Sequence, residues 1–182
     1  MSASASYDLR SHDMLPETAR ELMREELLHA TGAVVGRERL PEARHQQVIA
    51  RLSTSKAAQD RYIWGLWSGE SLAAFTQCAS YRPGALTMEA SVVAHGHRRR
   101  GLYSTLVRTV LTKARDRGYL DVVSSHVASN NPVLIAKLKL GFEVVGTEVS
   151  PEFGVVVRLC YPLDPERRAL LHMRTGWTPT PG

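Results

Sequence analysis

The sequence predicts an α+β domain, and three patterns lead to this fold class. Alternating, aromatic-rich stretches separated by turn signals between Arg61 and Val93 are typical of an antiparallel meander of three strands. A basic loop and an amphipathic helix pattern follow directly, from Arg98 to Gly118. A second strand-plus-helix unit and two closing strands complete the order of elements.

Length and composition fit one hydrophobic core, with 182 residues, of which 43% are hydrophobic and 23% charged. The net charge of +5 favours an anionic ligand, but it does not separate a small anion from a nucleic acid. The two cysteines, Cys78 and Cys160, lie in apolar strand-like runs and are predicted to be buried thiols. Neither a membrane-spanning stretch nor a secretory signal pattern is present, so we expect a cytoplasmic protein without a membrane partner.

The N-terminal part is predicted to be helical after a short frayed end. Residues 1–13 are rich in Ser and Ala without an apolar period. From Pro16, apolar residues recur at three- and four-residue steps, which predicts a helix that ends at Gly32. A second helix is expected from Pro41 to about Leu52.

The remaining elements follow in order along one predicted domain, residues 14–163. Its strands are expected at Arg61–Trp67, Leu72–Tyr81, Ala85–Val93, Leu120–Val127, Phe142–Val149 and Phe153–Pro162, with helices after Gly101 and Asn130. Residues 164–182 form a C-terminal tail in which Glu166–Met173 can make a short helix.

The loop between the third strand and the central helix has the properties of an anion site. It carries Arg98, Arg99 and Arg100 directly before Gly101. A helix N-terminus offers unpaired N–H groups and the positive end of the helix dipole, and glycine lets a ligand approach the backbone closely. The loop is therefore suited to a pyrophosphate, although it can equally be a basic turn that starts an amphipathic helix.

The same residues carry a family resemblance. Arg98–Tyr103, R-R-R-G-L-Y, resembles the acyl-CoA pyrophosphate loop Q/R-x-x-G-x-G/A of the GCN5-related N-acetyltransferase (GNAT) superfamily. Arg98 and Gly101 match the motif, whereas Tyr103 replaces a Gly or Ala. The backbone N–H of Tyr103 can still bind phosphate if its side chain points away from the cofactor.

A second segment, Asn130–Phe142, resembles a later motif of that family, N-x-x-A-x-x-x-Y-x-x-x-G-F. Asn130 and the closing Gly141–Phe142 match it. Lys137 replaces the tyrosine that often protonates the departing CoA thiolate. The two motifs stand in the expected order, and the resemblance covers Ile63–Pro162.

This resemblance implies a mixed, mostly antiparallel sheet of six or seven strands flanked by about four helices. Two central strands, Ala85–Val93 and Leu120–Val127, would splay apart to hold acetyl-CoA as a co-substrate, with no metal. A backbone N–H near Val93 would stabilise the charge on the thioester oxygen. The residues implied to bind the cofactor are Val92, Val93, Ala94, Arg98, Arg99, Arg100, Gly101, Leu102, Tyr103, Ser104, Asn130 and Lys137.

Two residues are candidates for the catalytic base. Glu89 lies on the strand before the loop, where several family members have a carboxylate; it can also be an outward-facing strand residue. His126 ends the strand on the other side of the splay and titrates near neutral pH, but a hydrogen-bonded core histidine is the favoured interpretation.

Other polar residues near the loop and in the second motif also bear on the predicted site. We expect Lys137 to be a solvated helix lysine beside Lys139, although it could stabilise or protonate a thiolate. Asn130 is expected to cap its helix and to reach the pantetheine region. His95 and His97 lack a third metal ligand nearby and are expected to lie near the cofactor phosphates.

The resemblance leaves three functional hypotheses. The first, which we favour, is an N-acetyltransferase that moves the acetyl group of acetyl-CoA to a primary amine of a small molecule by direct attack. The second is an acyl-CoA-binding sensor or partner protein without turnover, and the third acetylates a macromolecule such as aminoacyl-tRNA or a protein amine. Nucleic acid is compatible with the charge but not favoured, and a homodimer is compatible with the sequence. A basic patch away from the loop would favour the third hypothesis, and an acidic acceptor cleft would favour a cationic amine.

Overall fold

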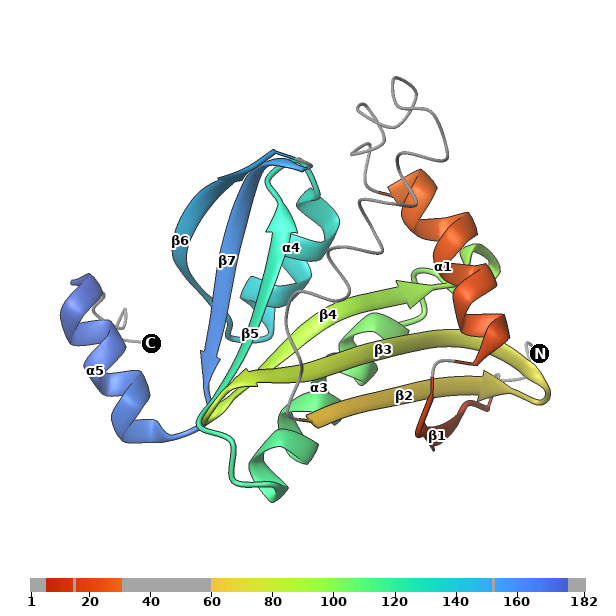
Figure 1. Ribbon diagram of the computed structural model, residues 1–182, viewed down its shortest axis with the longest axis horizontal. Helices are drawn as coiled ribbons and strands as arrows, with labels where there is room; N and C mark the ends of the chain where they lie inside the picture. The colour runs from red at the N-terminus through yellow and green to blue at the C-terminus, as the bar shows by residue number, and fades with distance from the viewer. Residues whose placement is uncertain (1–5, 15, 31–59, 152, 177–182) are drawn as a thin grey trace.

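The computed structural model describes residues 6–14, 16–30, 60–151 and 153–176, which form a seven-stranded sheet with helices on both faces (Figure 1). The helix expected from Pro41 lies outside these residues. The strands are β1 (Asp8–His12), β2 (Asp60–Ser68), β3 (Ser71–Arg82), β4 (Ala85–Val93), β5 (Asp121–Val127), β6 (Glu143–Ser150) and β7 (Gly154–Pro162). The helices are α1 (Glu17–Ala30), α3 (Leu102–Asp116), α4 (Asn131–Lys139) and α5 (Pro165–Thr175), with a 3-10 turn, η2, at His95–His97.

The strand order is β1-β2-β3-β4-β5-β7-β6. Only the β4–β5 pair is parallel, and every other neighbouring pair is antiparallel. The predicted mixed, mostly antiparallel sheet of six or seven strands is thus confirmed. None of the described helices is long and apolar enough to cross a membrane.

The expectation of a frayed N-terminus is wrong for Asp8–His12, which pairs antiparallel with β2. This strand is exposed along most of its length, so its backbone ladder rather than apolar burial holds it in place. A strand without a buried face leaves no apolar alternation in the sequence, which is why the pattern was missed.

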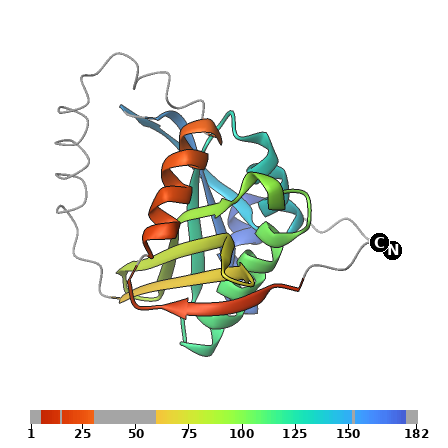
Figure 2. The same cartoon turned by 90° about the vertical axis from the view of Figure 1, so that its right-hand side faces the viewer.

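Helices α1 and α3 cover opposite faces of the sheet. Phe75 packs in a cluster with Ala19 and Leu22 of α1, whereas its neighbour Ala74 packs with Leu106 of α3. Successive strand residues point to opposite faces, so the two clusters lie on the two sides of β3. Figure 1 shows α1 in front of the sheet and α3 behind it, and Figure 2 shows the same two layers from the side.

The parallel pair β4–β5 is short. Ala85–Met88 pairs with Asp121–Ser124, and beyond the Met88–Ser124 pair the two strands part. Figure 1 shows β4 running toward α1 while β5 rises along β7. This divergence creates the splay that the family resemblance implied between these strands.

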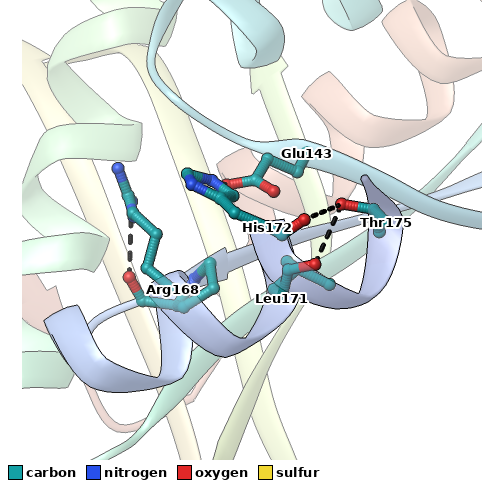
Figure 3. A network of polar contacts seen from close by, with 6 residues as sticks. Glu143, Arg168, Leu171, His172 and Thr175 are labelled. Atoms are coloured by element: carbon teal, nitrogen blue, oxygen red, sulfur yellow. Dashed lines mark hydrogen bonds and ion pairs between the residues drawn. The ribbon is translucent and has the colours of Figure 1, made fainter. Parts of the chain in front are cut away.

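Helix α5 packs against the end of the sheet and is longer than the helix predicted at Glu166–Met173. Asp164 caps it by accepting a hydrogen bond from the Arg167 N–H at 3.0 Å. The Arg167 guanidinium makes two bonds to the buried Asp121 carboxylate of β5, at 3.2 and 2.6 Å. Further along α5, His172 Nε2 lies 2.7 Å from Glu143 Oε1 of β6 (Figure 3). These contacts fasten the C-terminal helix to two strands.

Candidate active site

The basic loop has a backbone shaped by two residues with positive φ. Gly101 has φ 79° and Arg99 has φ 60°, a conformation that costs a non-glycine residue free energy. A Cβ on Gly101 would meet nothing within 4 Å, so the backbone angle rather than crowding within the protein favours glycine here. Helix α3 starts directly afterwards, and no side chain caps it. Its first N–H groups are thus left for an anion.

Three side-chain contacts hold the segment of this loop from His97 to Arg100. Arg98 Nε donates to the Val93 carbonyl at 3.3 Å, and Arg100 Nη1 donates to the Tyr7 hydroxyl at 3.4 Å. The Tyr7 hydroxyl also lies 3.2 Å from His97 Nδ1. Tyr7 was missed because it lies in the Ser- and Ala-rich N-terminal segment, where no pattern marks it.

The first turn of α3 points its larger side chains inward. Leu102 is buried and Ser104 half-buried. The ring of Tyr103 packs against the main core cluster, and its buried hydroxyl has no hydrogen-bond partner among the described residues. Burial raises the pKa of this phenol above its usual range. The side chain thus points away from the loop, which is the condition for phosphate binding by the Tyr103 N–H even though Tyr103 departs from the motif.

The end of β4 offers backbone groups beside the loop. Val92 is buried and Val93 and Ala94 are half-buried. Val93 pairs with Ala74 of β3 on one side, while in the described part of the chain β4 has no strand partner on the β5 side beyond Met88. Backbone groups on that open edge can pair with an extended ligand.

Glu89 lies where β4 leaves β5, in a β-bulge. The ladder with β3 pairs Gln77 with Ala90 and Cys78 with Met88, so Glu89 is the extra residue. Bulges re-aim a side chain and are common next to active sites. This bulge was not foreseen, because nothing in the local sequence marks it.

The Glu89 carboxylate is held by three side chains. Gln77 Nε2 donates to Oε2 at 2.8 Å, the Tyr81 hydroxyl donates to Oε1, and Arg61 Nη1 lies 3.6 Å from Oε2. The residue as a whole is exposed, but only 21% of its side-chain surface is accessible. Burial, and then the bond to Glu89, raise the pKa of Tyr81, so this phenol stays protonated and donates.

Lys137 is fully buried, so the expectation of a solvated lysine is wrong. Its Nζ lies 2.8 Å from Met88 Sδ and 3.9 Å from the centre of the Phe142 ring. No carboxylate contacts it among the described residues. Burial lowers the pKa of Lys137 from 10.5 to about 7. The Lys137 amine therefore changes its charge near neutral pH.

His126 is half-buried and lies near enough to Lys137 to respond to its charge. Its Nε2 lies 3.1 Å from Ser124 Oγ. Burial, and then the charge of Lys137, lower the pKa of His126 to about 4, so the imidazole is neutral at pH 7 and a weak base. Cys78, in the main core cluster, is a buried free thiol whose pKa is raised by burial to about 12, which makes it unreactive. Cys160 is free and half-buried.

Asn130 occupies the N-cap position of α4 and is half-buried, but its side chain makes no capping hydrogen bond. The prediction of a side-chain cap is therefore wrong. Across the residues that the structure describes, no three His, Cys, Asp or Glu side chains gather as a metal site.

A match to a protein-family model identifies the family of this chain. The model of the acetyltransferase (GNAT) family matches residues 20–142, more than half of the chain. This protein belongs to the GNAT acetyltransferase family. The family suggested by the two motifs is confirmed.

Solved structures share the GNAT fold at low sequence identity. The ribosomal-protein-S18-alanine N-acetyltransferase from Escherichia coli matches with a TM-score of 0.65 and 16% identity, over 87% of this chain and 94% of that one. A putative acetyltransferase from Salmonella typhimurium, solved with its cofactor acetyl-CoA, matches with a TM-score of 0.63 and 18% identity, over 87% and 95% of the two chains. The PaiA N-acetyltransferase from Thermoplasma acidophilum, solved with coenzyme A, gives 0.58 and 14%, over 85% and 99%. No curated protein sequence matches this chain.

Within this GNAT fold, the candidate residues divide between the two faces of the sheet. Met88, Cys78 and Lys137 lie on the face covered by α3 and α4, since Met88 and Cys78 pack in one cluster with α3. Glu89 bonds to Gln77 and Tyr81, which alternate with Cys78 and so point to the α1 face. The splay opens between the Glu89 carboxylate on one face and the Lys137 amine on the other.

Proposed function

We propose that this protein is an N-acetyltransferase that moves the acetyl group of acetyl-CoA to a primary amine of a small molecule. The observation that carries the proposal is the splay beyond the Met88–Ser124 pair, with the uncapped start of α3 at the basic loop beside it. An open strand edge next to an anion-binding helix terminus suits a ligand that joins an extended amide chain to a pyrophosphate.

The residues present fit coenzyme A on physical grounds. Arg98, Arg99 and Arg100 supply charge that does not titrate, and the N–H groups from Leu102 to Ser104 supply donors. Val92, Val93 and Ala94 supply backbone groups for the pantetheine, and the half-buried Asn130 lies at the start of α4 with its amide uncommitted to a cap. When bound, acetyl-CoA supplies the activated acetyl group as a thioester.

Glu89 accepts the proton of the attacking amine in this proposal. Transfer requires an uncharged amine, and a carboxylate near the splay takes up the proton as the C–N bond forms. Gln77 and Tyr81 fix the orientation of Glu89 through direct hydrogen bonds, and Glu89 takes up the proton directly or through one water. His126 is a weaker candidate, since its pKa of about 4 makes it a poor acceptor.

Lys137 donates a proton to the departing thiolate. With its pKa lowered to about 7, the ammonium form is present at neutral pH and gives up a proton readily. Its buried position beside Met88, the last β4 residue paired with β5, places it at the base of the splay. Lys137 thus takes the role of the tyrosine that the family motif has at this position.

Calorimetric titration with acetyl-CoA, followed by a thiol-release assay on a panel of amines, tests the proposal. We expect micromolar binding and release of CoA with one class of small amines. Binding without release on small amines would support the sensor hypothesis, and release only with a protein or RNA amine would support the macromolecular one. No binding would refute the cofactor assignment.

A further inference from the structure

A cavity of about 630 Å³ lies under α5, away from the basic loop. Its floor includes Thr87 and Ser125 of the sheet, and its wall includes Leu171 of α5. Thr87 follows Leu86, which packs in the cluster beneath α3, so Thr87 faces the α1 side of the sheet. The cavity therefore opens on the same face as the carboxylate of Glu89.

The charge of this cavity is strongly positive. Four arginines line it, namely Arg82, Arg158, Arg167 and Arg174, against one carboxylate, Asp121. Asp121 is already neutralised by its two bonds to Arg167. The other three arginines, Arg82, Arg158 and Arg174, have no ion-pair partner among the described residues.

These three arginines come from different elements and converge on one hollow. Arg82 ends β3, Arg158 lies in β7, and Arg174 lies in the last turn of α5. All three residues are exposed, so water screens their mutual repulsion in part, and an anion bound among them would relieve the rest. Guanidinium groups bind carboxylate and phosphate in a bidentate manner, which makes these the matching ligand chemistries.

Tyr81 joins this cavity to the candidate base. Its side chain lines the cavity, and its hydroxyl donates to Glu89. A molecule that occupies the cavity and extends past Tyr81 therefore brings its other end to the Glu89 carboxylate. A basic patch away from the loop was expected to favour a macromolecular acceptor. Here, however, the arginines line a cavity of about 630 Å³, within the roughly 300–1,000 Å³ of small-molecule sites, and this favours a small ligand.

We propose that the cavity under α5 binds the anionic group, a carboxylate or a phosphate, of an acetyl acceptor whose amine lies beside Glu89. This inference rests on the proposed acetyltransferase function and narrows its acceptor to an amine that carries an acid group. The cleft is basic, so a purely cationic amine such as a polyamine is disfavoured. Because α5 supplies Arg174 and holds Arg167 on Asp121, the helix is a specificity element.

The first test measures anion binding without any turnover. The protein is saturated with CoA, which occupies the loop, and titrated with inorganic phosphate at constant ionic strength in a calorimeter. We expect phosphate binding that falls at least tenfold in the Arg158→Met/Arg174→Met variant and is unchanged in Arg115→Met. Arg115 is an exposed residue in the last turn of α3, so its variant controls for lost charge. Equal phosphate affinity in all these proteins would overturn the proposal.

The second test uses matched acceptor pairs, each an amino acid or aminophosphonate beside the amine that lacks the acid group. We expect kcat/KM to favour the acidic member at least tenfold, and the double variant to lose that preference through KM. A preference for the amine without the acid group, or for an oligonucleotide or protein acceptor, would refute the inference while leaving the acetyltransferase intact. Absence of acetyl-CoA binding would refute the proposed function, and the phosphate titration, repeated without CoA, would still decide the chemistry of the cavity.

Discussion

The two faces of the splay place their ionisable groups in opposite environments. On the α1 face, Glu89 is an exposed residue whose carboxylate contacts three polar side chains. On the α3 and α4 face, Lys137 is buried against a thioether and an aromatic ring. The comparison teaches that polar contacts fix the orientation of the Glu89 side chain, whereas burial lowers the pKa of Lys137.

The largest expected effect is on the polar face. Glu89→Gln keeps the shape of the side chain but removes the proposed proton acceptor, so kcat/KM for the amine should fall by about 10²–10³. Acetyl-CoA affinity, measured by calorimetry, should stay within a factor of about two. His126→Asn serves as the comparison and should cost less than about tenfold. The reverse order of the two variants would assign the base to the buried face instead.

The next effect is on the buried face. Lys137→Met removes the proposed proton donor, and kcat should fall by about 10–10² with little change in acetyl-CoA affinity. Lys137→Tyr introduces a phenol, the side chain that the family motif has there, and should recover part of that loss. Equal activity of the Met and Tyr variants would mean that the side chain at position 137 contributes packing and does not donate a proton.

The same lysine gives a stability prediction with a definite sign. Its pKa is about 7 in the folded protein and 10.5 ordinarily, so between these values the unfolded chain binds more protons. The cost of burying Lys137 is complete below pH 7 and is relieved as the pH rises toward 10.5. Lys137→Met should therefore unfold at higher urea concentration than the parent at pH 6, with a gap that narrows by pH 10. A gap that widens with pH would contradict the buried-amine interpretation.

A smaller effect is expected at the basic loop, which adjoins both faces. Arg98→Ala/Arg100→Ala should weaken acetyl-CoA binding by about 10–50-fold, because two charge-assisted contacts to phosphate are lost. Melting temperature should change little, since both side chains are exposed. Arg115→Ala is the matched control, and an unchanged affinity in the double variant would remove the pyrophosphate assignment.

The smallest effect is expected at Tyr7. Tyr7→Phe removes the hydroxyl that contacts Arg100 and His97, so acetyl-CoA affinity should fall by only about two- to fivefold. Loss of affinity comparable to that of the arginine variant would mean that the Tyr7 hydroxyl determines the conformation of the loop.

The sequence predicted much of the fold, because its signals were local. The apolar face of α3 and the alternation of β4 placed these elements correctly, and the two motifs identified the family and the splay. It failed at β1, which has no buried face, and at Asn130, which occupies the cap position without making the bond. It also led to the wrong expectation that Lys137 is solvated. The apolar residues on both sides of Lys137 do not reveal which face of α4 packs against the core.

The sequence by itself determined the order of elements, the basic loop and the family, because helix and strand periods and short motifs depend on neighbours along the chain. Only the tertiary structure decided the environment of each ionisable group, which depends on residues distant in the sequence. Met88 and Phe142 bury Lys137, a bulge against β3 turns Glu89 toward Tyr81, and α5 returns to the sheet to complete an arginine-lined cavity. Desolvation and the convergence of charge arise from packing in space, so no local pattern could predict them.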